Sequence, residues 1–125
     1  TGAAISTTKA IHQYENNVDG MAIRAPIPVG SIVDVVFVCD RETTTEEVND
    51  IFREEAGTDR YRGVLGVAES EFVSSDIVGD PRASIVDAGM TMVVDGDLLK
   101  VMSWYDNEWG YTAQMVREAR ELLKG

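Results

Sequence analysis

A two-residue turn sequence, Asp95-Gly96, most constrains the fold because it lies between two apolar runs of the chain. The runs cover Met90 to Val94 and Leu98 to Met102. Asp-Gly favours a type I′ turn, since both central residues of that turn need a positive φ, and this turn joins antiparallel strands. The sequence therefore predicts a β-hairpin over residues 90–102.

Helical spacing marks further stretches of the chain. Thr44-Thr45-Glu46-Glu47 has the pattern of a capping box that opens a helix, and Gly57 ends it. The last helix runs from about Glu108 to Lys124 and has one apolar face, which needs an apolar surface to lean on. We also expect a short helix over residues 3–13, amphipathic and partly buried.

Apolar runs predict the remaining strands. They are Gly20 to Ala25, which Pro26 and Pro28 close, Ser31 to Cys39, Val64 to Val67 and Ala83 to Ala88. The second run is apolar on both faces except for Asp34, which is typical of a central strand covered on both sides. Hairpins and helices occur without strict β-α-β alternation, so we predict an α+β fold. This is a mostly antiparallel or mixed sheet with helices on one face, in a single domain over residues 1–125.

The stretch Ser103-Trp104-Tyr105-Asp106-Asn107-Glu108-Trp109-Gly110-Tyr111 is too polar for a core strand and too aromatic for an ordinary loop. It follows a strand pattern and precedes a helical one, so it is predicted to be a strand-to-helix turn. Asp106 and Asn107 fit two roles there: they could cap the helix, or their side chains could face a ligand. The residue types alone leave both alternatives open.

This stretch resembles the closing motif of the catalytic domain of glyceraldehyde-3-phosphate dehydrogenase. Thr1-Gly2-Ala3-Ala4 looks like the threonine-glycine turn of that family's inorganic-phosphate site, and Met21 to Pro26 looks like the strand that carries its phosphate-binding arginine. Ser74-Ser75-Asp76 and Val86-Asp87-Ala88 extend the resemblance along the chain. It implies the C-terminal part of an α+β catalytic domain, one face of whose sheet meets neighbouring subunits in a homotetramer.

The resemblance also assigns site residues. Thr1, Gly2 and Arg24 match the family's residues that bind substrate phosphoryl and inorganic phosphate, and a guanidinium offers such anions a bidentate fork. Asn107 matches the residue that hydrogen-bonds the nicotinamide carboxamide, and Tyr111 matches the aromatic beside that ring. The chain departs from the family at Ile27, where a hydroxyl side chain is usual.

The implied reaction is part of glycolysis and gluconeogenesis. It oxidises glyceraldehyde 3-phosphate with NAD or NADP and captures the acyl group with phosphate, using a cysteine nucleophile and a histidine base. The family's Ser-Cys-Thr-Thr-Asn stretch and its glycine-rich nucleotide-binding turn do not occur in this sequence. We therefore assign no catalytic or metal-binding residue, predict that the chain is inactive alone, and expect a fragment or processed product.

Other functions remain open from the sequence. An erythrose-4-phosphate dehydrogenase would share these motifs, and a non-catalytic assembly module or a phosphate-binding domain without redox function would also fit. The residues do not decide between NAD and NADP.

The net charge of the chain limits the classes of partner that it could bind. A net charge of −11, from 22 acidic against 11 basic residues, repels nucleic acid and anionic membranes. It also favours a halophilic enzyme, since molar salt screens charges beyond about 3 Å. Cys39 is the only cysteine, which is compatible with a reducing cytoplasm, and no apolar run approaches the roughly 20 residues of a membrane span.

Overall fold

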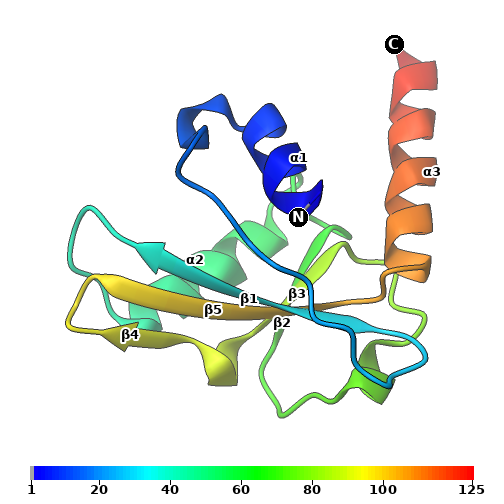
Figure 1. Cartoon of the computed structure of the whole chain (residues 1–125). Coiled ribbons are helices and arrows are strands. Elements are labelled where there is room, and N and C mark those ends of the chain that lie inside the picture. The colour runs from blue at the N-terminus through cyan, green and yellow to red at the C-terminus, as the bar shows by residue number, and fades with distance from the viewer. Residues whose placement is uncertain (1) are drawn as a thin grey trace.

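The computed structural model describes residues 2–125 (Figure 1). Its helices are α1 (Gly2–Ala10), α2 (Thr45–Gly57) and α3 (Trp109–Lys124), with short 3-10 helices η1 (His12–Tyr14), η2 (Ser74–Ile77) and η3 (Ala88–Met90). Its strands are β1 (Ser31–Val38), β2 (Leu65–Ala68), β3 (Ser84–Asp87), β4 (Met92–Val94) and β5 (Leu98–Tyr105). The predicted α+β class is confirmed.

The strands form one mixed sheet in the order β1-β5-β3-β2. β5 lies at its centre: β1 pairs with its whole length on one side, whereas β3 and β4 share the other side. All of these pairs are antiparallel, and only β2 and β3 run parallel. Because β5 continues directly into α3, the turn that follows it is fixed to the centre of the sheet (Figure 1).

The β4–β5 hairpin confirms the prediction from Asp95-Gly96. Both residues have positive φ, at 53° and 79°. The carbonyl of Gly96 also accepts a hydrogen bond of 2.8 Å from the Thr43 N–H, so the turn holds the chain that leads into α2.

The start of α2 confirms one half of the predicted capping box. The Thr44 hydroxyl oxygen accepts a hydrogen bond of 3.1 Å from the Glu47 N–H. The Glu47 carboxylate is directed elsewhere: it accepts from Arg41 at 2.6 Å and from the Thr43 hydroxyl at 2.7 Å. The Glu47 side chain therefore links the first turn of α2 to the loop before the helix instead of completing the capping box.

Buried side chains form a small core on each face of the sheet. Ile85 and Val86, adjacent in β3, point to opposite faces and are 0% and 2% exposed. The cluster beneath α2 consists of Val48, Val86 and Val101 with Phe52, Leu65 and Leu99 packed against it. The cluster on the opposite face consists of Ala68, Ile77 and Ile85 with Phe72 and Trp104.

Two strand predictions need correction. Residues 20–25 form no strand, because no described strand pairs with this segment and an apolar run alone supplies no ladder. Met21 and Ile23 are 83% and 85% exposed. β1 is an edge strand rather than a central one, and most of its residues are exposed. Asp34 finds its partner in Lys100 at 2.8 Å, across the pair with β5.

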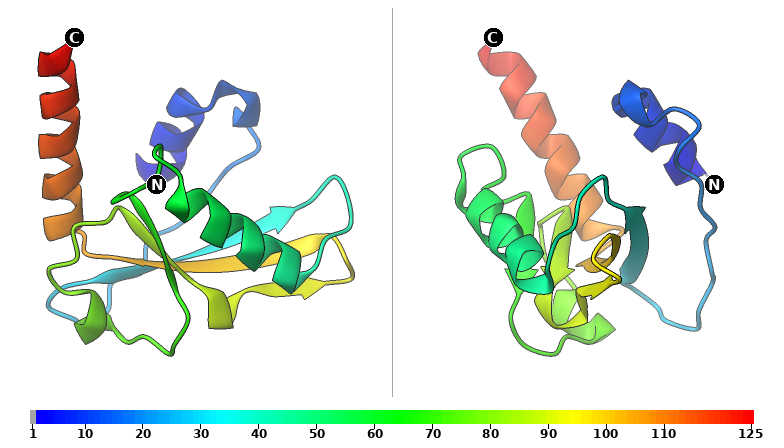
Figure 2. Two further views of the ribbon diagram at one scale, coloured as in Figure 1. Left: turned by 180° about the vertical axis from the view of Figure 1, so that it is seen from behind. Right: turned by 90° about the vertical axis from the view of Figure 1, so that its left-hand side faces the viewer.

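The helices differ in how they meet the sheet. α2 packs against it, whereas α1 lies on the opposite side and contacts mainly η1 (Figure 2). α1 has no fully buried residue, and its predicted partial burial is limited to Ala4 and Thr8, which are half-buried. α3 stands away from the sheet, and Leu122 and Leu123 near its end are 81% and 88% exposed (Figure 2). In the part of the chain that the structure describes, no helix is long and apolar enough to cross a membrane.

Candidate functional site

The predicted strand-to-helix turn is confirmed, and Asp106 acts as its cap. The side chain of Asp106 is 3% exposed, and its Oδ1 accepts hydrogen bonds from the N–H groups of Glu108 at 2.9 Å and Trp109 at 2.8 Å. Its Oδ2 accepts from the Gly79 N–H at 2.8 Å. These bonds favour the carboxylate form, and they hold the pKa of Asp106 below its usual range, with the bond from Gly79 as the largest cause. Asp106 therefore has a structural role as the cap of this turn.

Asn107 does not cap α3, because its side chain turns toward the start of β1. Its Oδ1 accepts hydrogen bonds from the Gly30 N–H at 3.2 Å and from the Ser31 hydroxyl at 3.4 Å. The residue is exposed, and its Nδ2 donates to no residue of the described chain. The amide is thus anchored through its oxygen, while its N–H groups remain available to a ligand.

Gly30 and Ser31 are site residues that the sequence reasoning missed. They lie 77 and 76 positions before Asn107, so no local pattern connects them. Gly30 has a φ of 98°, and a Cβ there would come within 2.8 Å of the Ile77 Cδ1. A glycine between a predicted turn and a predicted strand was the available signal.

The aromatic residues of the turn divide into two groups. Trp104 packs into the core, and its Nε1 donates to the buried Asp87 carboxylate at 3.0 Å. Trp109 and Tyr111 lie in the first turn of α3 and are 60% and 69% exposed. The two exposed rings and the Asn107 amide border the same turn, which gives the surface both a stacking and a hydrogen-bonding character.

The first half of α3 is fixed by a close approach and by polar contacts. Gly110 is buried, and a Cβ on it would lie 2.7 Å from the Arg82 carbonyl oxygen. One turn later, Gln114 Nε2 donates to the carbonyl oxygens of Pro81 at 2.8 Å and Gly63 at 3.1 Å. The helix start, and with it the turn, is held against the loop that precedes β3.

The predicted phosphate residues are not gathered around Asn107. Arg24 lies on the exposed segment between η1 and β1, and its guanidinium has no hydrogen bond or ion pair with residues 2–125. Gly2 begins α1 and is exposed. Thr1 lies outside the described residues. The structure therefore brings Asn107 and Tyr111 onto one turn, and among the described residues no hydrogen bond or ion pair joins Arg24 or Gly2 to it.

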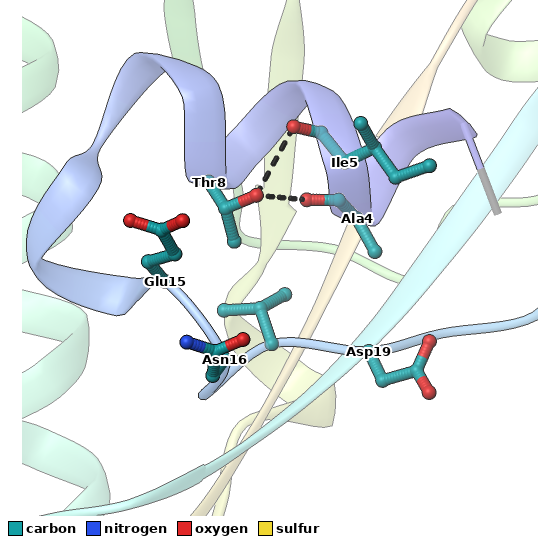
Figure 3. A pocket seen from close by; sticks show the side chains of 7 residues that line it. Ala4, Ile5, Thr8, Glu15, Asn16 and Asp19 are labelled. Carbon is teal, nitrogen blue, oxygen red and sulfur yellow. Dashed lines mark hydrogen bonds between the residues drawn. The ribbon is translucent and has the colours of Figure 1, made fainter.

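A hollow of about 360 Å³ lies between α1 and the segment after η1 (Figure 3). It is lined by Ala4, Ile5, Thr8, Glu15, Asn16, Val18 and Asp19. The Thr8 hydroxyl is engaged within α1, where it donates to the carbonyl oxygens of Ala4 and Ile5 at 3.3 and 3.1 Å (Figure 3). Since two carboxylates and no basic side chain line it, this hollow does not suit a phosphate.

A second, more apolar groove of about 400 Å³ is lined by Ile27, Pro28, Val29, Ser74, Ser75 and Val78. It lies next to Gly30, whose N–H holds Asn107. Among the described residues, no group of His, Cys, Asp and Glu side chains is arranged to hold a metal ion.

Comparisons with known proteins agree with the motifs. The family model described as "Glyceraldehyde 3-phosphate dehydrogenase, C-terminal domain" matches residues 1–107. A glyceraldehyde-3-phosphate dehydrogenase from Streptomyces coelicolor is 43% identical over 93% of this chain and 34% of its own length. Proteins of the same name from Zymomonas mobilis and Haloarcula vallismortis are 42% and 45% identical over 99% of this chain, which covers 37% and 36% of them. The chain spans about a third of the length of these curated relatives.

Proposed function

Because the chain belongs to the glyceraldehyde-3-phosphate dehydrogenase family and corresponds to its C-terminal domain, we propose that it supplies the phosphate-binding and nicotinamide-contacting residues of a phosphorylating dehydrogenase. The complete enzyme would oxidise glyceraldehyde 3-phosphate with NAD or NADP in glycolysis and gluconeogenesis. In this proposal residues 1–125 are one unit, the C-terminal portion of the catalytic domain. An erythrose-4-phosphate dehydrogenase is not favoured, because the reported relatives are named for the glyceraldehyde substrate.

The observation that carries the proposal is the way in which the Asn107 side chain is held. Its oxygen is anchored by Gly30 and Ser31, and its amide nitrogen is presented on an exposed turn. A carboxamide group needs an amide or similar partner, since ionised carboxylates cannot donate. The exposed ring of Tyr111 lies about one helical turn away and suits packing beside a flat heterocycle. These residues fit a nicotinamide, which when bound accepts the hydride of the substrate.

Arg24, Gly2 and Thr1 are proposed to bind the substrate phosphoryl group and inorganic phosphate. The guanidinium of Arg24 has no partner within the described residues, so an anion can take up its donors without breaking an existing ion pair. Gly2 begins α1, and the N–H groups at a helix start have no intrahelical acceptor. The anion sites and the cofactor site would then lie on different segments of this chain and meet in the complete enzyme.

The chain is not proposed to complete the reaction by itself. Its single thiol, Cys39, follows β1, and nothing in the sequence matches the family's nucleophile stretch. Hydride removal from an aldehyde in this family needs a thiolate nucleophile and a base, which this chain does not provide. The proposed enzyme therefore depends on further sequence for its catalytic cysteine, its histidine and most of its NAD or NADP contacts.

The proposed partners are other subunits of a homotetramer, and the open face of the sheet is the surface that would meet them. This face lies opposite α2, and its exposed apolar residues are Ile32, Val36, Val38, Met92, Val94 and Leu98. The Asp34–Lys100 ion pair lies among them on the same face. Exposed apolar side chains gathered on one face are typical of a protein interface. No nucleic acid or membrane partner is proposed, because the charge is −11.

We further propose a cytoplasmic, salt-adapted enzyme. The excess of carboxylates is consistent with a salt-rich cytoplasm, where dissolved salt screens their mutual repulsion. The single cysteine is compatible with a reducing compartment.

Two substitutions in the full-length enzyme test the site. Arg24→Leu should lower kcat/KM for the phosphorylated aldehyde roughly ten- to a hundredfold, because hydrogen bonds to charged groups contribute about 1.5–3 kcal/mol. The unphosphorylated aldehyde should be affected much less. Asn107→Ala should lower kcat/KM for both aldehydes alike, because it weakens the positioning of the cofactor. Equal ratios of kcat/KM for the two aldehydes in wild type and Arg24→Leu would refute the phosphate role.

A further inference from the structure

Asp106 joins two segments of the chain beside Asn107. Its carboxylate accepts from the N–H groups of Glu108 and Trp109, which immediately follow Asn107, and from the N–H of Gly79 in the loop after η2. All three distances fall between 2.8 and 2.9 Å, and the side chain is 3% exposed. A buried carboxylate with this number of backbone donors is fixed in one rotamer.

The fixed carboxylate limits how Asn107 can move. Asn107 lies between Asp106 and Glu108, so both of its backbone neighbours take part in the same hydrogen-bond cluster. On the other side, its oxygen is bound to Gly30 and Ser31. The amide is thus located by the α3 start, the loop at Gly79 and the β1 start together. Removing the Asp106 carboxylate would release the start of α3 from the loop at Gly79.

The loop at Gly79 is itself well supported. Asp80 binds Arg82 through both of its oxygens, at 2.9 and 2.6 Å, and this pair holds the pKa of Asp80 below its usual range. Gly110 packs closely against the Arg82 backbone. The loop therefore provides a rigid reference, and the Asp106 carboxylate transmits its position to the turn that carries Asn107.

We propose that Asp106 is a positioning residue for the Asn107 amide, and that it acts on the nicotinamide end of the cofactor without touching it. This inference rests on the proposed cofactor role of Asn107. It assigns the neighbouring carboxylate the task of keeping the amide at the place and angle that the carboxamide requires, since such groups must be held within about 0.5 Å to function.

The test compares two helix caps in the full-length enzyme. Asp106→Ala removes the cap of α3, and Thr44→Ala removes the cap of α2, whose hydroxyl accepts from the Glu47 N–H at 3.1 Å. Both variants should lose stability, which thermal unfolding measures. Only Asp106→Ala should weaken binding of the nicotinamide cofactor, with Kd raised about tenfold, equivalent to about 1.4 kcal/mol.

The decisive probe is ADP-ribose, or its 2′-phosphate if the enzyme uses NADP, because it lacks the nicotinamide ring. Asp106→Ala should leave the Kd of ADP-ribose within about twofold of the wild-type value. A general loss of structure would instead weaken the binding of ADP-ribose and of the nicotinamide cofactor equally. Asp106→Asn keeps an oxygen for Glu108 and Trp109 but places an amide N–H toward Gly79. It should show a smaller, nicotinamide-selective loss, and it decides the question if the alanine variant does not fold.

The possible failures can be told apart. If Asn107→Ala leaves cofactor binding unchanged, the proposed function of Asn107 is wrong and this inference falls with it. If Asn107→Ala weakens the cofactor selectively over ADP-ribose but neither Asp106 variant does, the positioning role alone is refuted. An equal loss for both ligands in the Asp106 variants would also refute it.

Discussion

Gly110 offers a sharp test of how α3 is held against the rest of the domain. A Cβ at this position would lie 2.7 Å from the Arg82 carbonyl oxygen and 3.5 Å from the Asp80 carbonyl oxygen. Both are backbone atoms in a supported loop, so the contact cannot be relieved by turning a side chain. Gly110→Ala therefore forces the helix start away from the loop, and overpacking of this kind costs about 1–3 kcal/mol.

The helical gain from alanine opposes that cost by roughly 1 kcal/mol, so the net effect should be a loss of about 0–2 kcal/mol. Gly57→Ala is the matched control: Gly57 is the last residue of α2, and a Cβ there would meet no atom within 4 Å. The control should gain about 0.5–1 kcal/mol.

Denaturant unfolding of the two variants measures both free energies, and the two should differ by about 0.5–3 kcal/mol. A gain of stability in Gly110→Ala equal to that in Gly57→Ala would contradict the close approach of α3 to the loop.

Two further predictions concern solution conditions. The melting temperature should rise between dilute buffer and molar KCl, because salt screens the repulsion within a chain of net charge −11; a flat or falling melting temperature would remove the halophilic interpretation. Stability should also fall in acid. The Arg41 hydrogen bond, helped by Thr43, lowers the pKa of Glu47 from 4.5 to about 2. This contribution is complete above the unfolded value and is lost as the pH falls toward 2. Glu47→Gln should flatten the fall in urea-measured stability between about pH 5 and 3, and an unchanged slope would argue against the pairing.

Local signals were sufficient where the interaction itself is local. The Asp95-Gly96 turn needs positive φ at two adjacent residues, and Thr44 needs only the N–H three residues later. These features depend on a few neighbouring residues, and the structure contains both. The amphipathic pattern of α3 also predicted its helix, because spacing alone determines which face is apolar.

Predictions failed where a partner from elsewhere was required. The apolar run that contains Met21 and Ile23 suits a strand, but a strand forms only when another segment accepts and donates its backbone hydrogen bonds. β1 is apolar on both sides, yet within this chain it has a neighbour on one edge only. The apolar side chains of β1 therefore suit a strand that is covered on both faces, and residues 2–125 do not cover it in this way.

The candidate site shows the same division. The motif identified Asn107, but periodicity could not indicate that Gly30 and Ser31 would hold its oxygen from 77 and 76 positions away. Likewise, the choice between capping and ligand contact for Asp106 and Asn107 needed the geometry of the Gly79 loop. Asp106 caps the helix through Glu108 and Trp109 while the Gly79 N–H holds its other oxygen, and Asn107 stays exposed.

The most direct test of the account is a structure of the full-length protein bound to its nicotinamide cofactor and inorganic phosphate. We predict that the Asn107 side chain lies about 2.7–3.2 Å from the nicotinamide carboxamide, with the Tyr111 ring beside the nicotinamide and the Arg24 guanidinium bound to an anion. A carboxamide held by other residues, with Asn107 bonded only to Gly30 and Ser31 and Arg24 in solvent, would contradict it.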